Sequence, residues 1–225
     1  MKNSVFITGT DTDAGKTVTA KAILQIAAQR GLSTVGFKPI SAGCSETANG
    51  LRNEDALSLQ SASSINVTYD EVNPVAFADP VAPHLAALRT KQKINVEQIT
   101  SAYLHLNSYN ADLLLTEGAG GWRLPLGQGQ FLSDFVIQHK IPVILVVGLK
   151  LGCLNHALLT YQAIIADGVE VIGWVANQID EQMLYLQDNI DSLKELIPAP
   201  CLGVVPRLNN IEQAQDFLTL DVLFK

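Results

Sequence analysis

The sequence predicts an α/β fold in which a single, doubly wound and mostly parallel sheet carries helices on both faces. Short runs rich in Val, Ile and Leu alternate along the chain with segments of helical periodicity, as in successive strand-helix-strand units. These apolar runs are nearly continuous, which is typical of strands buried on both faces of a parallel sheet. Because 48% of the 225 residues are hydrophobic, a sizeable core is possible, and we expect residues 1–225 to form one domain.

The individual elements follow from these runs in chain order. Strands are predicted at residues 4–8, 34–37, 112–116, 142–147, 171–176 and 201–205. Helices are predicted at residues 16–30, 54–61, 96–108, 131–139, 155–166 and 183–196. Residues 58–81 carry the weakest pattern. In a sheet of this kind ligands bind beyond the carboxyl ends of the strands, so the residues after each strand are the candidates for a site.

A glycine-bounded loop follows the first predicted strand. Residues 9–17 read Gly-Thr-Asp-Thr-Asp-Ala-Gly-Lys-Thr and lead into a predicted amphipathic helix that Gly31 closes. Such a loop directs N–H groups at an anion, with Lys16 for the β- and γ-phosphates and the Thr17 hydroxyl for Mg²⁺. Gly9 and Gly15 enclose one residue more than the common pattern, and a plain strand-to-helix turn is the alternative. The context favours a site for ATP or GTP, which makes this a fold of the P-loop NTPase type.

Polar side chains follow the other predicted strands. Lys38 faces the γ-phosphate in this topology, or is a surface lysine. Glu117 stands where P-loop proteins hold the acid that supports Mg²⁺, or it is a capping or loop residue. Asp55 fits a helix-start acid as well as a metal ligand. Asn177 fits a tight turn as well as a residue that contacts a base edge.

Composition excludes several classes of function. A net charge of −7 argues against a broad nucleic-acid surface. No apolar run approaches the ~20 residues that span a bilayer, and no signal-peptide pattern opens the chain, so we expect a cytoplasmic protein without membrane contact. The three cysteines, Cys44, Cys153 and Cys201, lack the spacing of a zinc site or a disulfide framework.

Taken in order, these motifs resemble those of the dethiobiotin synthetases. The resemblance rests on residues 9–17, on Lys38-Pro39 with Gly43, on Glu117-Gly-Ala-Gly-Gly-Trp, and on residues 51–55, 73–74, 83–84, 142–148, 151–156 and 173–177. It covers about residues 5–208, and the extra residue in the phosphate loop is this family's own form. The family closes the ureido ring of dethiobiotin, the penultimate step of biotin synthesis, from diaminopelargonic acid, CO₂ or bicarbonate and ATP with Mg²⁺.

The resemblance implies a role for each site residue. It makes Lys38 and Lys16 the catalytic cations, and Thr17, Asp55 and Glu117 the ligands of Mg²⁺. Residues implied in ATP binding are Asp13, Ala14, Gly15, Lys16, Thr17, Val18, Asp55, Glu117, Gly118, Ala119, Gly120, Asn177, Gln178, Pro206, Arg207 and Leu208. Residues implied in substrate binding are Thr12, Lys38, Ser41, Ala42, Gly152, Cys153, Leu154 and Asn155. The last four would reach the substrate from the partner subunit of a homodimer whose substrate site is shared.

Two points leave the sequence interpretation open. Many relatives carry Ser directly before the glycine that corresponds to Gly43, whereas here Ser41 precedes Ala42, so one hydroxyl contact to the substrate is in question. A P-loop switch or partitioning-type ATPase, which acts through a protein partner, shares the predicted fold and is the alternative function. Lys38 and the lack of a basic surplus count against it.

Overall fold

A parallel sheet lies at the centre of the protein. The structure, a computed structural model, describes residues 3–221. The strands of the sheet are β1 (Asn3–Gly9), β2 (Thr34–Phe37), β7 (Leu113–Glu117), β10 (Val143–Leu149), β11 (Val171–Gln178) and β12 (Cys201–Val205). Their order is β12-β11-β10-β1-β7-β2, and every neighbouring pair is parallel, which confirms the predicted fold class.

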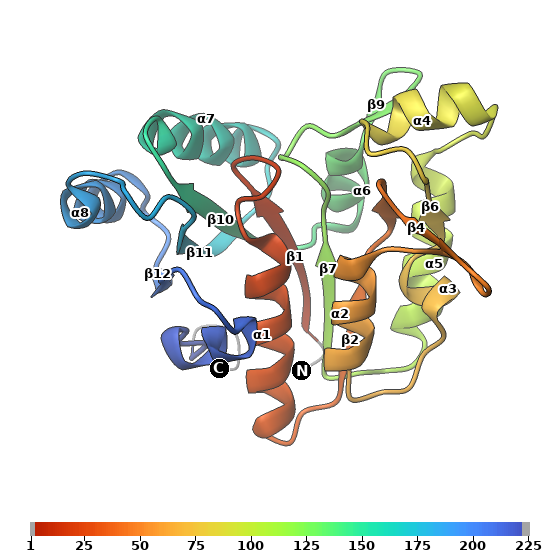
Figure 1. The fold of residues 1–225 in the computed structure, drawn as a ribbon, viewed down its shortest axis with the longest axis horizontal. Coiled ribbons are helices and arrows are strands. Elements are labelled where there is room, and N and C mark those ends of the chain that lie inside the picture. The colour runs from red at the N-terminus through yellow and green to blue at the C-terminus, as the bar shows by residue number, and fades with distance from the viewer. Residues whose placement is uncertain (1–2, 222–225) are drawn as a thin grey trace.

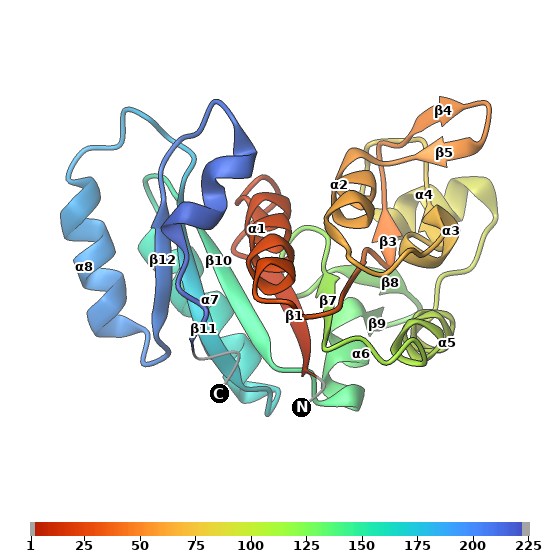
Figure 2. The ribbon, with the colours of Figure 1, turned by 90° about the horizontal axis from the view of Figure 1, so that it is seen from below.

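Helices cover both faces of this sheet (Figures 1 and 2). They are α1 (Lys16–Gln29), α2 (Glu54–Ala62), α3 (Tyr69–Val72), α4 (Pro83–Thr90), α5 (Val96–Asn107), α6 (Leu132–His139), α7 (Cys153–Ala166), α8 (Leu186–Leu196) and the 3₁₀ helix η1 (Ile211–Phe217). Successive side chains of β1 point to opposite faces. Val5 and Ile7 join the core under α1, whereas Phe6 joins the core under α5, α6 and α7. Both faces of the strand are therefore apolar.

Three pairs of short strands lie outside the central sheet, and the sequence interpretation missed all of them. They are β3 (Ile40–Ser41) with β6 (Val75–Ala76), β4 (Ser45–Thr47) with β5 (Gly50–Arg52), and β8 (Pro125–Gly127) with β9 (Gln130–Phe131). Elements of two or three residues are too short to express a hydrophobic period. The first two pairs, with α3 and α4, fill the segment between β2 and α5 on the right of Figure 1.

Two predicted helix starts differ from the observed ones by more than one residue. The helix predicted from residue 155 begins at Cys153, directly after Gly152, whose φ of 93° breaks the chain direction there. The helix predicted from residue 183 begins only at Leu186, because Tyr185 has a φ of 52° and cannot belong to a right-handed helix. Within residues 3–221, no helix has both the length and the hydropathy that crossing a membrane requires.

Candidate functional site

The phosphate loop joins β1 to α1 at the carboxyl edge of the sheet. Gly15 takes a φ of 95° and precedes α1 without any side-chain cap, so the N–H groups of the first helical turn remain available to an anion. A Cβ atom at Gly15 would lie 2.0 Å from Nδ2 of Asn177, which leaves room for glycine alone. Nζ of Lys16 donates to the carbonyl of Asp11 at 2.9 Å. Burial, and then the charge of Lys38, lower the pKa of Lys16 to about 8, a cost that a nearby phosphate would offset.

A second cluster of charges lies beside the loop. Lys38 is buried, and its Nζ donates to Oε1 of Glu117 at 2.6 Å and lies 3.3 Å from Oδ2 of Asp55. The same Oε1 atom accepts from the hydroxyl of Thr17 at 2.9 Å. Burial alone would lower the pKa of Lys38, but the carboxylates of Glu117 and Asp55 outweigh it and raise that pKa. Lys38 is therefore a cation, held between two carboxylates.

The oxygen atoms of this cluster suit a hard divalent cation. Glu117 is fully buried, and its Oε2 atom has no hydrogen-bond partner among residues 3–221. Such an atom is costly unless a ligand satisfies it. Mg²⁺ is usually held by one or two carboxylates together with substrate phosphates and waters. Thr17, Asp55 and Glu117 offer that donor set; among residues 3–221 no group of three or more His, Cys, Asp or Glu side chains could hold a metal by itself.

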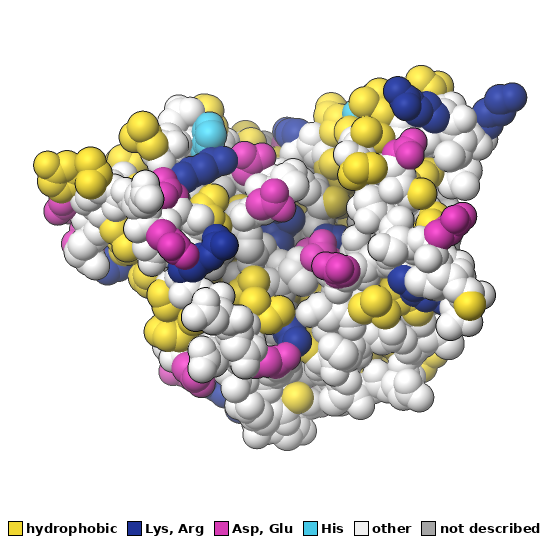
Figure 3. All heavy atoms as spheres, in the orientation of Figure 1, with side chains coloured by type: hydrophobic (Ala, Val, Ile, Leu, Met, Phe, Trp, Pro, Cys, Tyr) yellow, Lys and Arg dark blue, Asp and Glu magenta, His cyan; other side chains and the backbone are white. Residues whose placement is uncertain are grey.

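The two clusters open into one cavity of about 680 Å³. Figure 3 shows the hollow in the middle of this face, with acidic and basic side chains around it. Most of the predicted site residues line the cavity: Thr12, Asp13, Gly15, Lys16, Thr17, Val18, Lys38, Ser41, Ala42, Asp55, Glu117, Ala119 and Gly120. Ala14 is buried behind the loop, and the carbonyl of Gly118 accepts from Lys38 at 3.0 Å. The structure thus brings residues of four distant segments to one place.

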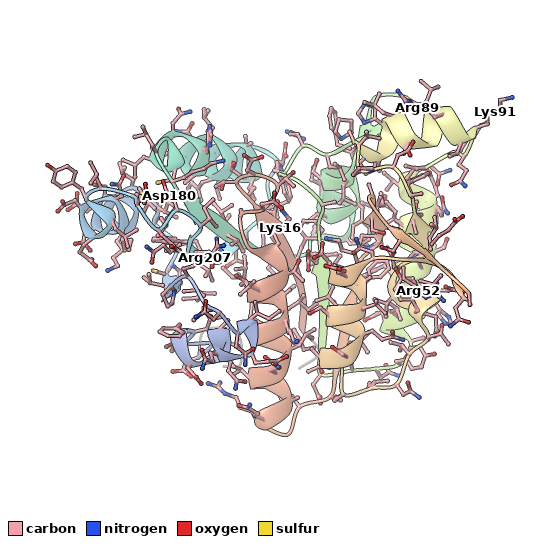
Figure 4. The ribbon with its side chains drawn as sticks, in the orientation of Figure 1. Lys16, Arg52, Arg89, Lys91, Asp180 and Arg207 are labelled. Carbon is pink, nitrogen blue, oxygen red and sulfur yellow. The ribbon has the colours of Figure 1, made fainter. Side chains whose placement is uncertain are left out.

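The remaining predicted residues lie outside this cavity. Those near the carboxyl ends of β11 and β12 are Asn177, Gln178, Pro206, Arg207 and Leu208. Asn177 is buried, and its amide donates to the carbonyl of Ala14 at 3.0 Å, so it braces the phosphate loop from behind. In Figure 4, Arg207 and Asp180 lie on the α8 side of Lys16. The other group, Gly152, Cys153, Leu154 and Asn155, forms the start of α7.

The order of Ser41 and Ala42 has a clear structural consequence. The hydroxyl of Ser41 donates to Oδ1 of Asn73 at 2.7 Å and lies 3.1 Å from Sγ of Cys44. The hydroxyl therefore bonds within the protein, although Ser41 borders the cavity. Ala42 borders the cavity as well and has no hydroxyl to offer. Ser41 thus does not replace the hydroxyl that many relatives carry one position later.

The sequence interpretation missed part of the cavity wall. Asn53, the residues 80–83 and Leu124 line it as well. Asn53 could have been expected, since an Asn that precedes a helical run is a common N-cap, and its side chain accepts from Ala56 N at 3.1 Å. The loop of residues 80–83 contains two prolines but no periodic pattern, so only the resemblance, which includes residues 83–84, pointed to this part of the chain.

The loop after β7 is anchored on its far side by an acid that the sequence did not single out. Oδ2 of Asp167 accepts from the indole of Trp122 at 2.6 Å, and its Oδ1 accepts from Arg123, also at 2.6 Å. Asp167 caps the carboxyl end of α7. These contacts tie the glycine-rich segment beyond Glu117 to a helix on the opposite face from α1.

The parallel sheet, the phosphate loop and the clustered cations define the class: this is a P-loop nucleotide-binding protein. Two solved structures agree at the level of the fold. FtsY from chloroplasts of Physcomitrella patens has a TM-score of 0.52 at 18% identity, and the signal recognition particle receptor FtsY from Elizabethkingia anophelis has 0.51 at 17%. Each alignment covers 100% of this chain and 66% of the other, so this chain spans slightly less than two thirds of those proteins.

Sequence similarity is more specific. A family model described as an AAA domain matches residues 3–215. The ATP-dependent dethiobiotin synthetase BioD of Cellvibrio japonicus (strain Ueda107) is 52% identical over 208 residues, which are 92% of this chain and 91% of that protein. The enzyme of the same name from Aeromonas salmonicida (strain A449) is 48% identical over 222 residues, with 99% and 98% covered. The chain belongs to the ATP-dependent dethiobiotin synthetase family, which confirms the resemblance inferred from its motifs.

Proposed function

We propose that the protein closes the ureido ring of dethiobiotin from diaminopelargonic acid, CO₂ and ATP, in the biosynthesis of biotin. One observation supports this reaction independently of family membership: the phosphate loop and the buried cation Lys38 line the same cavity. A cavity of about 680 Å³ is large enough for a substrate beside the phosphates of a nucleotide. The lack of a basic surplus, at a net charge of −7, counts against a switch or partitioning-type ATPase.

The chemistry explains why such cations are needed. One amine of the substrate adds to CO₂ and loses a proton, which gives a carbamate. A carbamate oxygen then attacks the γ-phosphorus of ATP, the bond to the bridging oxygen breaks, and ADP leaves. The neighbouring amine attacks the carbamate carbon of this phosphorylated carbamate, phosphate leaves, a second proton is lost and the ring closes. The main obstacle is the repulsion between the carbamate and the polyphosphate.

The charged residues of the cavity address that repulsion. Lys16 binds the β- and γ-phosphates at the start of α1, and Lys38 neutralises the carbamate and the transferring phosphoryl group. Thr17, Asp55 and Glu117 hold Mg²⁺, which supplies further positive charge at the phosphate oxygens. Hydrogen bonds and ion pairs hold Thr17, Lys38, Asp55 and Glu117 to one another, and a site whose charges are held in place needs little reorganisation during the reaction.

The substrate and the nucleotide approach from opposite sides of this centre. Thr12, Asp13, Ser41 and Ala42 border the cavity beside Lys38 and contact the diamine end, Ser41 by atoms other than the hydroxyl that bonds to Asn73. A carboxylate such as that of Asp13 favours an amine there. The adenine lies beyond the loop, next to Asn177. The base site is completed by Gln178, Pro206, Arg207 and Leu208, and the loop residues 13–18 with residues 118–120 surround the phosphates.

The distal carboxylate of the substrate binds to a partner subunit in a homodimer. The start of α7 lies outside the cavity of its own chain, and Gly152 gives this helix no side-chain cap, so its N–H groups are suited to an anion. Leu151 is 94% exposed there, and Leu159, Leu184 and Tyr185 are also exposed on α7 and before α8. Exposed apolar side chains of this kind are typical of a surface that a second subunit covers.

A phosphate-release assay tests the reaction. The protein is incubated with ATP and Mg²⁺, with and without diaminopelargonic acid and bicarbonate. Release that requires both additions, together with dethiobiotin in the products, supports the ligase. Release that is independent of them would support the switch ATPase instead.

A mixing experiment tests the shared site. Lys38→Ala and Gly152→Leu chains, each inactive alone, should regain part of the activity when mixed, since one site of the mixed dimer then has both intact residues. The matched control is Gly168→Leu at the opposite end of α7. Gly168 also has a positive φ and, like Gly152, has nothing within 4 Å of an added Cβ. A monomer by light scattering, or the absence of recovery, would refute the shared site.

The remaining proposals concern context. We place the protein in the cytoplasm, because Cys44, Cys153 and Cys201 are all unpaired, as is usual in a reducing compartment. The single central sheet supports the view that residues 1–225 act as one ligase domain.

A further inference from the structure

The side chain of Asn73 joins Lys38 and Ser41, which border the cavity, to Tyr69 and Val75, which lie behind them. Its Nδ2 donates to the carbonyl of Lys38 at 2.7 Å and to that of Val75 at 3.4 Å. Its Oδ1 accepts from the hydroxyls of Ser41 at 2.7 Å and Tyr69 at 2.9 Å. Carbonyl groups only accept hydrogen bonds, so this arrangement fixes the orientation of the amide. Asn73 is buried and uses its full hydrogen-bonding capacity, although it lies outside the cavity itself.

The backbone of Lys38 depends on this segment. Lys38 follows β2, which ends at Phe37, so the central sheet no longer holds it. Its N–H donates to the carbonyl of Val72 at 2.8 Å, and its carbonyl accepts from Asn73. Residues 72 and 73 thus hold both backbone polar groups of Lys38, while carboxylates hold its ammonium group. Without Asn73 a buried carbonyl would lose its donor, and the base of the Lys38 side chain would be free to shift.

The hydroxyl of Tyr69 extends the network to the start of α2. It donates to Asn73 and accepts from the backbone N–H of Asn53 at 2.7 Å. Burial raises the pKa of Tyr69, so its hydroxyl keeps the proton that it donates. Asn53 caps α2, and Asp55 in the first turn of that helix lies beside the ammonium of Lys38. One buried network therefore links the base of Lys38 to the helix that carries one of its carboxylate partners.

We propose that Asn73 and Tyr69 are positioning residues for the reaction: they set the place of Lys38 relative to Asp55 and the phosphate loop without touching a substrate. The inference rests on the proposed role of Lys38. Reacting groups that are displaced by a fraction of an ångström lose much of the benefit of a preorganised site. The network should therefore affect the chemical step more than the binding of ATP.

The test compares two tyrosines. Tyr69→Phe removes the hydroxyl that links α2 to Asn73 and keeps the ring. The matched control is Tyr103→Phe on α5, because Tyr103 is as buried as Tyr69, 7% against 8% exposed, and its hydroxyl also donates a hydrogen bond, to the partly buried Ser4 at 2.8 Å. For Tyr69→Phe we expect kcat to fall about 10-fold, with the dissociation constant of Mg·ATP changed by less than about 2-fold. Tyr103→Phe should leave kcat unchanged, although its urea midpoint should fall by about as much as that of Tyr69→Phe.

A second variant tests the other arm of the network. Asn73→Asp keeps an oxygen for Ser41 and Tyr69 but replaces the donor to the Lys38 carbonyl by an acceptor, so we expect a larger fall in kcat than for Tyr69→Phe. If Asn73→Asp does not fold, the two tyrosine variants decide alone. Equal kcat values for Tyr69→Phe and Tyr103→Phe would overturn the inference.

The role of Lys38 is checked separately. If Lys38→Ala retains turnover, the proposed function of Lys38 fails, and the positioning inference fails with it. If Lys38→Ala loses turnover while the two tyrosine variants match each other, only the positioning inference fails.

Discussion

Replacing Lys38 by methionine should destabilise the folded protein far more than replacing a lysine of an exposed ion pair. The side chain of Lys38 is 3% exposed and lies 2.6 Å from Oε1 of Glu117, which is 0% exposed. Methionine keeps the unbranched shape but removes the charge, so Glu117 would be left as a buried carboxylate whose other oxygen already has no partner. Removing one member of a buried pair typically costs about 3–5 kcal/mol in the free energy of unfolding.

The assay is urea denaturation at pH 7, followed by the fluorescence of the buried residues Trp122 and Trp174. The double variant Lys38→Met/Glu117→Gln removes both charges and should recover about 1–3 kcal/mol of the loss, since no uncompensated charge then remains. The control is Lys194→Met. Its ion pair with Asp191, at 3.2 Å, lies at the surface with both side chains about half exposed, so little change is expected.

Two outcomes would refute the expected coupling between Lys38 and Glu117. If Lys38→Met loses no more stability than Lys194→Met, Lys38 does not stabilise the buried carboxylate of Glu117. If the loss in the double variant equals the sum of the two single losses, Lys38 and Glu117 do not interact across the 2.6 Å that separates them.

Three further predictions concern catalysis, metal binding and pH. Lys16→Ala and Lys38→Ala should each lower kcat by about 10²–10³-fold, but calorimetry should find weaker ATP binding only for Lys16→Ala; equal losses of affinity would contradict these separate roles. Asp55→Asn and Glu117→Gln should raise the Mg²⁺ concentration for half-maximal activity, since an amide lacks the charge of a hard-cation ligand; unchanged metal titrations would exclude the assigned roles. Hydrogen bonds, above all from the hydroxyl of Thr68 at the start of α3, lower the pKa of Glu71 from 4.5 to about 2. Glu71→Gln should therefore cost about 1–2 kcal/mol at pH 7, after allowance for solvent screening. The difference from wild type should vanish as the pH falls from about 4.5 to about 2 in acid unfolding, and a difference that persists below pH 2 would refute the linkage.

The sequence predicted the central sheet well because the information for it is local. Each strand is an apolar run long enough to be recognised. The strands β2, β7 and β10 are buried on both faces along their whole length, whereas the edge strand β12 is only partly buried. The phosphate loop is local too, since residues 9–17 contain its glycines, its lysine and its hydroxyl. Glu117 could be assigned to the site because it ends the apolar run of residues 113–116, which the structure shows to be a strand adjacent to β1.

The rest of the site could not be predicted, because its contacts join residues far apart in the chain. Asn177 fits a turn as well as a base contact by sequence, and only the fold reveals that its amide meets the carbonyl of Ala14, 163 residues away. The place of Asn73 depends on Ser41, 32 residues earlier, and on the carbonyl of Lys38. Such hydrogen bonds leave no periodic signal in the chain.

This division has a physical reason that bears on the site itself. A phosphate loop uses backbone N–H groups, so its geometry follows from glycines and a helix start, and it is available wherever a strand turns into a helix. A buried ammonium group needs carboxylates at its tip and a fixed backbone at its base, because its charge is costly in any other arrangement. The segment between β2 and α5 lies outside the central sheet, and its helices and strands are short, with none longer than nine residues. Side chains that bond to backbone groups, such as Asn73 to the carbonyl of Lys38, take the place of a sheet or helix there. Substitutions in this segment should therefore affect catalysis through Lys38 even where they are remote from the cavity.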